Sequence, residues 1–242
     1  MAKDSFIFKR VEKKYLLDRA KKEALLGEIM PMLIPDQYGR STISSLYLDT
    51  PDFRIIRASI EAKLWGHPYK EKLRLRTYGV PENGSKVFLE IKKKYKGVVY
   101  KRRISLTHAD AMGYILGGEK PPDSQIMREI DYAMSFYGSP KPSALVSYER
   151  DAFFVRDLPT LRITFDSGVR YRTDDLDLKK GNGGKVLLPE GYTLMEIKTD
   201  GAMPLWLSHA LDELKIYPAS FSKYGKAYDD IVINKERGII NG

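Results

Sequence analysis

The sequence has no cysteine among its 242 residues and only three histidines. Disulfides, thiol catalysis and cysteine-based zinc or iron–sulfur centres are therefore excluded. His67, His108 and His209 are scattered and match no ligand spacing such as H-x-x-x-H, so we predict no metal role for them. No stretch approaches the roughly 18 apolar residues of a membrane span, and the N-terminus lacks the apolar core of a signal peptide. We expect a soluble protein of the cytoplasm.

The charge is strongly unbalanced. Lysine and arginine together number 41 against 32 aspartates and glutamates, which gives a formal net charge of +9. Hydrophobic residues make up 43% of the chain, an ordinary share for a globular protein. The excess of cations favours an anionic partner, but net charge alone does not separate nucleic acid, a membrane surface and a phosphorylated small molecule.

Hydrophobic periodicity predicts an α+β protein. Strands are expected at residues 6–17, 41–50, 70–79, 86–95, 98–106, 144–155, 160–172 and 192–200, and helices at 18–33 (with Asp18 as N-cap), 107–118, 123–138, 202–216 and 222–238. Most strands are joined by short turns, which favours antiparallel pairing. No linker or repeat divides the chain, so we expect one domain over residues 1–242. About eight strands are enough for a closed barrel to hold a small ligand.

Charged residues gather on one face of each predicted strand. Because side chains two apart share a face, the strands group Arg10, Glu12 and Lys14; Lys72, Arg74 and Arg76; Glu90, Lys92 and Lys94; Lys101 and Arg103; Arg150; Arg162 and Asp166; and Glu196 and Lys198. The opposite faces are apolar, as in Leu73 and Leu75. An ordinary solvated sheet face explains any one strand. The repeated arginines and the recurring Glu-x-Lys pattern favour an enclosed anion site for the set.

A closed barrel with this pattern would bring about ten cations into one lumen, where they would repel each other strongly if left without anions. Arginine binds phosphate oxygens with two parallel hydrogen bonds, and lysine supplies a compact charge. A few carboxylates among them suit a divalent cation, which can bridge phosphate oxygens. The pattern therefore predicts a site for a chain of phosphates. The Gly-rich segment 179–185 lacks the spacing of a P-loop and is interpreted as a flexible hairpin tip.

The same residues carry a family resemblance. The matching motifs are RVEKKY (10–15), LYLDTPDF (46–53), EKLRLRTYG (71–79), VFLEIKKK (87–94), VVYKRR (98–103), SYERDAFF (147–154), LRITFD (161–166), LMEIKTDG (194–201) and FSKYGKAY (221–228). In this order they resemble the VTC domain, the polyphosphate polymerase branch of the CYTH/triphosphate tunnel metalloenzyme superfamily. The similarity runs from about Phe8 to Tyr228.

The resemblance implies an antiparallel β-barrel tunnel with helices packed around it. It also implies transfer of the γ-phosphate of ATP onto a growing polyphosphate chain, with Mn²⁺ or Mg²⁺. The catalytic positions would be Arg74, Arg76, Lys92, Arg150, Arg162 and Glu196. Further phosphate-binding positions would be Arg10, Lys14, Lys72, Lys94, Lys101, Arg103, Lys198, Ser222 and Lys223, with Ser222 as N-cap of the last helix. Glu196 would be the principal metal ligand, aided by Glu90 or Glu12.

One position departs from the family pattern. RVEKKY is similar to the superfamily signature E-x-E-x-K, but Arg10 stands where the first glutamate is expected. In hydrolytic relatives that glutamate helps to hold metal and to position water. Its replacement by a cation favours a site that binds more phosphates and delivers water less well, which is the pattern of the polymerase branch.

Several alternatives remain open. A triphosphate hydrolase could use the same tunnel, and a non-catalytic sensor of polyphosphate, inositol phosphate or nucleotide would need only its cations. Nucleic-acid binding is disfavoured, because Tyr100 is out of phase with Lys101 and Arg103 and no stacking aromatics accompany the cations. The lysines of helix 18–33 fit a solvated face, with a peripheral membrane or protein partner as the alternative. The oligomeric state is not determined by the sequence.

Overall fold

A computed structural model describes residues 11–37, 39–96 and 98–236. The strands are β1 (Val11–Leu17), β2 (Leu33–Pro35), β3 (Ser41–Asp49), β4 (Tyr69–Tyr78), β5 (Lys86–Tyr95), β6 (Val98–Thr107), β7 (Lys141–Val155), β8 (Leu158–Arg172), β9 (Lys185–Val186) and β10 (Thr193–Thr199). The helices are α1 (Arg19–Ile29), α2 (Arg54–Leu64), α3 (His108–Ile115), α4 (Gln125–Phe136), α5 (Leu205–Glu213) and α6 (Lys223–Glu236), with short 3₁₀ turns at Met30–Met32 and Leu178–Lys180.

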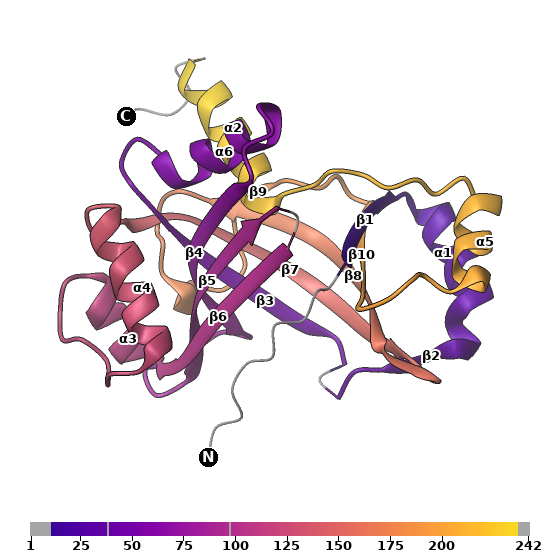
Figure 1. The fold of residues 1–242 in the computed structure, drawn as a ribbon, viewed down its shortest axis with the longest axis horizontal. Coiled ribbons are helices and arrows are strands. Elements are labelled where there is room, and N and C mark those ends of the chain that lie inside the picture. Colours follow the sequence, from indigo (N-terminus) through magenta and orange to yellow (C-terminus); the bar gives the residue numbers. More distant parts are fainter. Residues whose placement is uncertain (1–10, 38, 97, 237–242) are drawn as a thin grey trace.

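The strands form one strongly curled antiparallel sheet. Its order is β1-β10-β8-β7-β3-β4-β5-β6, with β2 added to β7 and β9 to β8. Strands β4 to β6 make one wall and β1, β10 and β8 make the other, with β3 and β7 between them (Figure 1). Within the described residues no backbone pairing joins β1 to β6. Instead, an ion pair of 3.6 Å between Lys92 Nζ on β5 and Glu12 Oε2 on β1 links the two walls where their backbones are not paired. The predicted α+β class and antiparallel barrel are confirmed.

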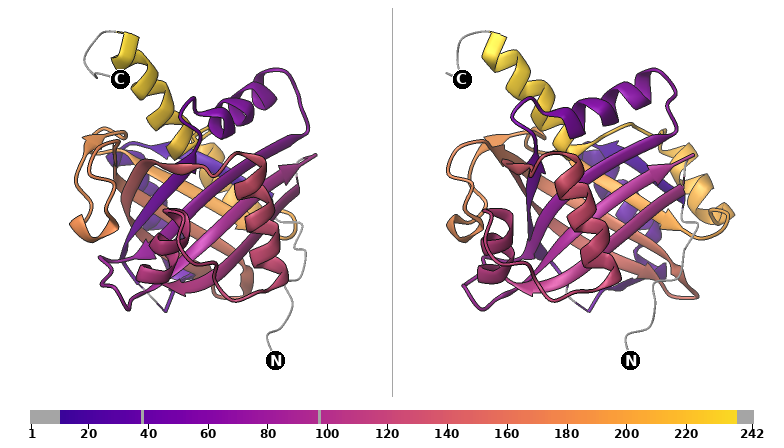
Figure 2. Two further views of the ribbon diagram at one scale, coloured as in Figure 1. Left: turned by 90° about the vertical axis from the view of Figure 1, so that its left-hand side faces the viewer. Right: turned by 60° about the vertical axis from the view of Figure 1, so that its left-hand side comes forward.

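The described residues form three hydrophobic clusters, of which two lie on the outside of the two walls and a third packs β3, β7 and β8 against α2 and α6. Leu73 and Leu75 of β4 are fully buried against α3 and α4, in the cluster that includes Ile115 and Met127. A second cluster packs β1, β8 and β10 against α1 and α5. Helices accordingly cover the outside of both walls (Figure 2). The predicted alternation is confirmed, because the leucines of β4 point outward and Arg74 points into the barrel.

Several predicted boundaries were wrong. The helix expected at 18–33 ends at Ile29, because a 3₁₀ turn that contains Pro31 begins at Met30 and the chain then enters β2. The segment 179–185 lies in the connection between β8 and β9, which pair antiparallel, so its predicted place at a hairpin tip is confirmed, and its Asn182 carbonyl accepts a hydrogen bond from Ser147 Oγ at 3.1 Å. Residues 6–10 of the first expected strand lie outside the described residues. Asp18 caps α1 as predicted. None of the helices in the described part of the chain is long and apolar enough to cross a membrane.

Helix α2 was not predicted, and the buried Asp49 organises it. The Asp49 carboxylate accepts hydrogen bonds from the N–H groups of Ile55 at 2.8 Å and Ile56 at 3.1 Å, which lie in the first turn of α2. It also accepts one from the hydroxyl of Tyr224 in α6 at 2.8 Å. This single side chain therefore links the end of β3 to two helices, and α6 begins at the predicted phosphate-binding pair.

Replacing Asp49 by alanine should lower the free energy of unfolding by about 2–3 kcal/mol, because it removes a helix cap and leaves a buried hydroxyl without its acceptor. Urea unfolding followed by circular dichroism measures the loss. Asp52→Ala is the matched control, since this carboxylate is exposed and its contacts, with the Thr50 hydroxyl and in a solvated ion pair with Arg57, should be worth less than about 0.5 kcal/mol. Equal losses for the two variants would contradict the role given to Asp49.

Candidate anion-binding site

A cavity of about 480 Å³ lies inside the barrel, a size within the usual range for small-molecule sites. It is enclosed by side chains from β1, β3, β4, β5, β7 and β10 and by the segment that leads into α6. The predicted site residues that line it are Glu12, Lys14, Lys72, Arg74, Arg76, Lys92, Lys94, Arg150, Glu196, Lys198, Ser222 and Lys223. Strands distant in the chain thus deliver their charged faces to one space, as the alternation predicts.

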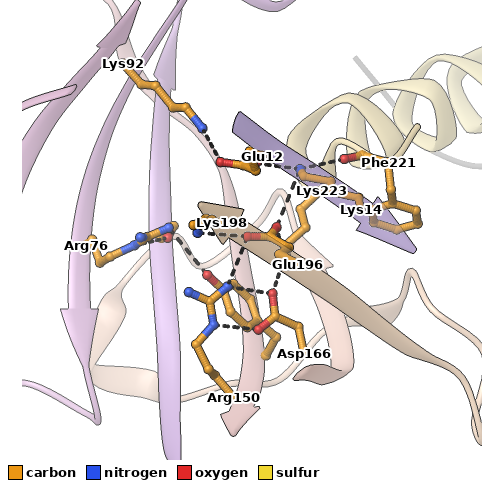
Figure 3. Close-up of polar contacts among 12 residues, drawn as sticks. Glu12, Lys14, Arg76, Lys92, Arg150, Asp166, Glu196, Lys198, Phe221 and Lys223 are labelled. Carbon is orange, nitrogen blue, oxygen red and sulfur yellow. Dashed lines mark hydrogen bonds and ion pairs between the residues drawn. The ribbon is translucent and has the colours of Figure 1, made fainter. Parts of the chain in front are cut away.

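Glu196 lies at the centre of the cations on the β1–β10–β8 wall (Figure 3). Its Oε1 is 3.5 Å from Lys14 Nζ and 3.6 Å from Lys223 Nζ, while its Oε2 is 3.1 Å from Lys198 Nζ and 3.7 Å from Arg150 Nη2. Burial disfavours its charged form, but Lys198, Lys223, Lys14 and Arg150 outweigh that cost and hold the pKa of Glu196 well below its ordinary value. The carboxylate is therefore ionised at neutral pH.

Asp166 binds two of the cations that surround Glu196. Its carboxylate accepts two parallel hydrogen bonds from Arg150, Nε at 2.6 Å and Nη2 at 2.7 Å, and a further bond from Lys223 Nζ. This bidentate pairing fixes the plane of the Arg150 guanidinium, whose Nη2 also lies 3.7 Å from Glu196 Oε2. Asp166 was placed on this face by the sequence but was not among the predicted site residues.

Glu90 plays the corresponding role on the opposite wall. The side chain is fully buried, and its Oε2 accepts from Arg74 Nε at 2.7 Å while its Oε1 is 2.6 Å from Lys101 Nζ. Burial would raise its pKa, but Arg74, Arg76 and Lys101 outweigh burial and lower it to about 2. Both oxygens are thus engaged with cations of the chain. Glu90 positions Arg74 and Lys101, and its surroundings give no support to the predicted role as a metal ligand.

The wall made of β4 to β6 also holds lysines whose positive charge is only partly balanced by nearby carboxylates. Burial and neighbouring cations lower the pKa of Lys72 to about 8, although its Nζ donates to Ser222 Oγ at 2.7 Å. Burial likewise lowers the pKa of Lys101 to about 7, because repulsion from Arg76 and Arg74 adds to the cost that Glu90 only partly offsets. Burial lowers the pKa of Lys92 as well. A polyanion in the cavity would relieve this imbalance.

Four predicted residues in the described part of the chain are not part of the cavity lining: Glu90, Lys101, Arg103 and Arg162. Arg162 is on the predicted face, but its guanidinium pairs with Asp36 beyond β2 and lies 5.4 Å from the Phe154 ring. Arg103 is exposed and stacks on Phe88 at 4.6 Å. Lys101 reaches the site only through Glu90. Arg10 lies outside the described residues.

Two tyrosines were missed by the sequence analysis. The Tyr47 hydroxyl lies 3.4 Å from Arg74 Nη1, and the Tyr148 hydroxyl lies 3.4 Å from Arg76 Nη2. The Tyr148 ring also lies under Lys223 Nζ, with 4.3 Å to the ring centroid. Burial would raise the pKa of Tyr47, but Arg74, Lys72 and other cations outweigh burial and lower it to about 8. Tyr148 shares a strand face with the predicted Arg150, and that parity was the available signal, whereas no site residue was predicted on β3, the strand that carries Tyr47.

The carboxylates can accommodate a divalent cation of the kind the resemblance implies. Among the described residues no group of three or more histidines, aspartates and glutamates is arranged to hold a metal. Glu12 and Glu196 lie on neighbouring strands and face the same cavity, with Glu12 opposite Lys198. Mg²⁺ commonly takes one or two carboxylates and completes its shell with water and substrate phosphates. This donor set fits such an ion once a phosphate ligand is bound.

Fold and cavity together define an antiparallel barrel that encloses a basic anion site. The chain belongs to the VTC domain family, whose model matches residues 9–232. The resemblance drawn from the sequence motifs is thereby confirmed. No curated protein matches this chain significantly.

Solved structures share the fold at low sequence identity. A putative adenylate cyclase from Bacillus halodurans is 12% identical and superimposes with a TM-score of 0.51 over 88% of this chain and 95% of that one. A putative adenylate cyclase from Vibrio parahaemolyticus is 13% identical, with a TM-score of 0.48 over 90% and 97%. The putative adenylyl cyclase HpAC1 from Hippeastrum, described as having a dominant triphosphatase activity, is 15% identical, with a TM-score of 0.48 over 89% and 93%. The likeness to the Bacillus protein shows the fold alone.

Replacing Tyr148 by phenylalanine should weaken binding of inorganic tripolyphosphate by about fivefold, because the hydrogen bond that holds Arg76 is lost while the ring under Lys223 remains. Tyr148→Leu removes both contacts and should weaken binding further. Isothermal titration calorimetry measures the affinities. Tyr132→Phe, a change at an exposed tyrosine of α4, is the matched control and should leave affinity unchanged. An unaltered affinity in Tyr148→Leu would contradict this positioning role.

The affinity for tripolyphosphate should fall as pH rises from about 7 to 9, because the lowered pKa values make Lys101 and Lys72 lose their charge across this range. Tyr47 ionises in the same pH range, and the negative charge that it gains also lowers the affinity for tripolyphosphate. Bound anion favours the charged lysines, so binding at pH 8 should take up protons. Calorimetry in two buffers of different ionisation enthalpy measures this uptake, and Lys72→Met should reduce it. An uptake of zero would show that these lysines are already charged in the free protein.

Proposed function

We propose that this protein is a metal-dependent polyphosphate polymerase, which transfers the γ-phosphate of ATP onto a growing polyphosphate chain inside the barrel. Support comes first from the cavity, where cations from both walls face a space of phosphate-binding size. Arg74, Arg76 and Arg150 offer planar guanidinium groups, and Lys14, Lys92 and Lys223 add compact charges. Ser222 caps α6 through Gly225 N–H, so the positive end of this helix also points to the cavity.

Our choice of a phosphate acceptor over water rests on the ionisation of the carboxylates inside the barrel. Glu12, Glu90, Asp166 and Glu196 all face cations, and in each the pKa lies below its ordinary value because these cations outweigh burial. Carboxylates with such low pKa values are weak general bases. A water nucleophile benefits from a base, whereas the terminal phosphate of polyphosphate is already ionised at neutral pH. The site therefore favours a phosphate acceptor over water, in line with Arg10 in place of the first signature glutamate.

In the proposed reaction a terminal oxygen of bound polyphosphate attacks the γ-phosphorus of ATP in line. One phosphorus–oxygen bond forms, the bond from the γ-phosphorus to the bridging oxygen breaks, and ADP leaves with the electron pair of that bond. Arg74, Arg76 and Arg150 neutralise the charge that spreads over the transferred group, so positioning and electrostatics supply the catalysis. Glu196 and Glu12 would hold a Mn²⁺ or Mg²⁺ ion, which supplies further neutralisation of phosphate oxygens. A single domain over the whole chain and a cytoplasmic location remain predictions.

Purified protein incubated with ATP and Mn²⁺ should yield ADP and polyphosphate, measured by gel electrophoresis and by separate assays of ADP and orthophosphate. Glu196→Gln should reduce turnover at least about a hundredfold while tripolyphosphate binding persists, because one negative charge is lost from among four cations. Arg74→Ala should reduce turnover by a similar factor, and Lys22→Ala on α1 is the control with full activity. Orthophosphate as the sole product would support a hydrolase instead. Binding without any turnover in the unaltered protein would support a sensor.

A further inference from the structure

Two loops meet at one corner of the barrel and expose large apolar side chains. The end of α2 exposes Leu64 and Trp65, with 71% and 77% of their surfaces accessible. The turn between β5 and β6 lies beside it, because Lys96 N–H donates to the Pro68 carbonyl at 2.9 Å and Tyr69 is paired with Tyr95. Both views of Figure 2 place the end of α2 and this turn at the same corner. We call the exposed set Lys63, Leu64, Trp65, Tyr69, Tyr95 and Lys96 the aromatic-basic rim.

The rim is positively charged and adjoins the mouth of the cavity. Lys70 and Lys94, which follow it inward along β4 and β5, line the cavity itself. Burial lowers the pKa of Lys70, and repulsion from Lys94 and Lys63 adds to this effect, so these cations lie close together. Lys96 Nζ lies 5.5 Å from the centroid of the Tyr95 ring. The rim therefore combines protruding apolar groups with a local excess of positive charge.

We propose that the aromatic-basic rim docks this protein onto an anionic lipid surface. Tryptophan and tyrosine favour the headgroup region of a bilayer, where one part of the side chain is apolar and another is hydrated. Lysines beside them gain from the negative potential of acidic lipids. Leu64 and Trp65 project together from one helix end, which suits insertion into the lipid interface. Docking at this corner would place the mouth of the cavity next to the membrane.

Other occupants fit the rim less well. A second copy of the chain in a two-fold contact would bring Lys63, Lys70 and Lys96 against their own equivalents, which costs energy. Single-stranded nucleic acid could stack on the aromatic rings of the rim, but it would leave the apolar Leu64 exposed to water. An anionic bilayer matches both the apolar and the basic components.

The test is co-sedimentation of the full chain with phosphatidylcholine vesicles, with and without phosphatidylserine, in the absence of nucleotide. Binding should require phosphatidylserine and weaken as salt is raised. The double variant Lys63→Ser/Trp65→Ser should weaken vesicle affinity at least about fivefold, the effect of a single lysine near an anionic surface. The matched control is Leu205→Ser/Lys226→Ser, which removes an equally exposed leucine of α5 and an exposed lysine of α6 and should bind as the unaltered protein does.

A second readout uses the unaltered protein. The chain has two tryptophans, and Trp206, a residue of α5, is partly buried against the core under α1 and α5. Brominated phosphatidylserine vesicles should therefore quench Trp65 and leave the remaining emission of a Trp65→Phe variant unquenched. Equal vesicle affinity of both double variants, or binding that ignores phosphatidylserine, would overturn the proposal. So would self-association that disappears in Trp65→Ser, or displacement of the protein from vesicles by single-stranded RNA through the rim. These outcomes are independent of ATP turnover.

Discussion

Like charges that face each other inside a barrel need anions between them, and here three buried carboxylates meet that need. Glu90 holds Arg74 and Lys101 on one wall, while Asp166 and Glu196 hold Arg150 and Lys223 on the other. Removing one partner of such a buried network leaves uncompensated charge, which is far more costly than losing a surface pair. The free protein can therefore keep its cavity open, and the lysines that remain short of anions are the basis of the polyanion binding that we propose.

The inward charges are tolerated because the outward faces of the same strands supply the hydrophobic cores. In β4 the buried Leu73 and Leu75 alternate with Lys72, Arg74 and Arg76, so one strand serves both layers. The apolar clusters under α3 and α4 and under α1 and α5 hold the two walls at a fixed curvature. A one-residue slip in register would exchange the faces of a strand and place leucines in the cavity, so the alternation specifies the site as strongly as it specifies the fold.

This two-residue period is local, which is why the strands, their faces and most of the cavity lining could be predicted from the sequence. Interactions between distant segments could not. Arg162 and Asp166 share a predicted strand face, yet only the folded structure shows that Asp36, which follows β2, binds Arg162. Glu90 was predicted as a possible metal ligand because the sequence does not show which residues contact it. In the fold its carboxylate is occupied by Arg74 of β4 and Lys101 of β6. Helix α2 was not predicted because Asp49, which caps it, lies just before Pro51 and was interpreted as the end of a strand.

Helix α6 connects the two walls into one unit. Tyr224 is held by Asp49, and its ring stacks on Tyr47 with 4.3 Å between centroids, while the Tyr47 hydroxyl contacts Arg74. The residue before it, Lys223, contacts Asp166 and Glu196 on the other wall. A shift of α6 would therefore disturb the cations of both walls together. The proposed transfer between two bound phosphate chains requires donor and acceptor to be aligned at the same moment, and a helix that contacts both walls would couple the two alignments.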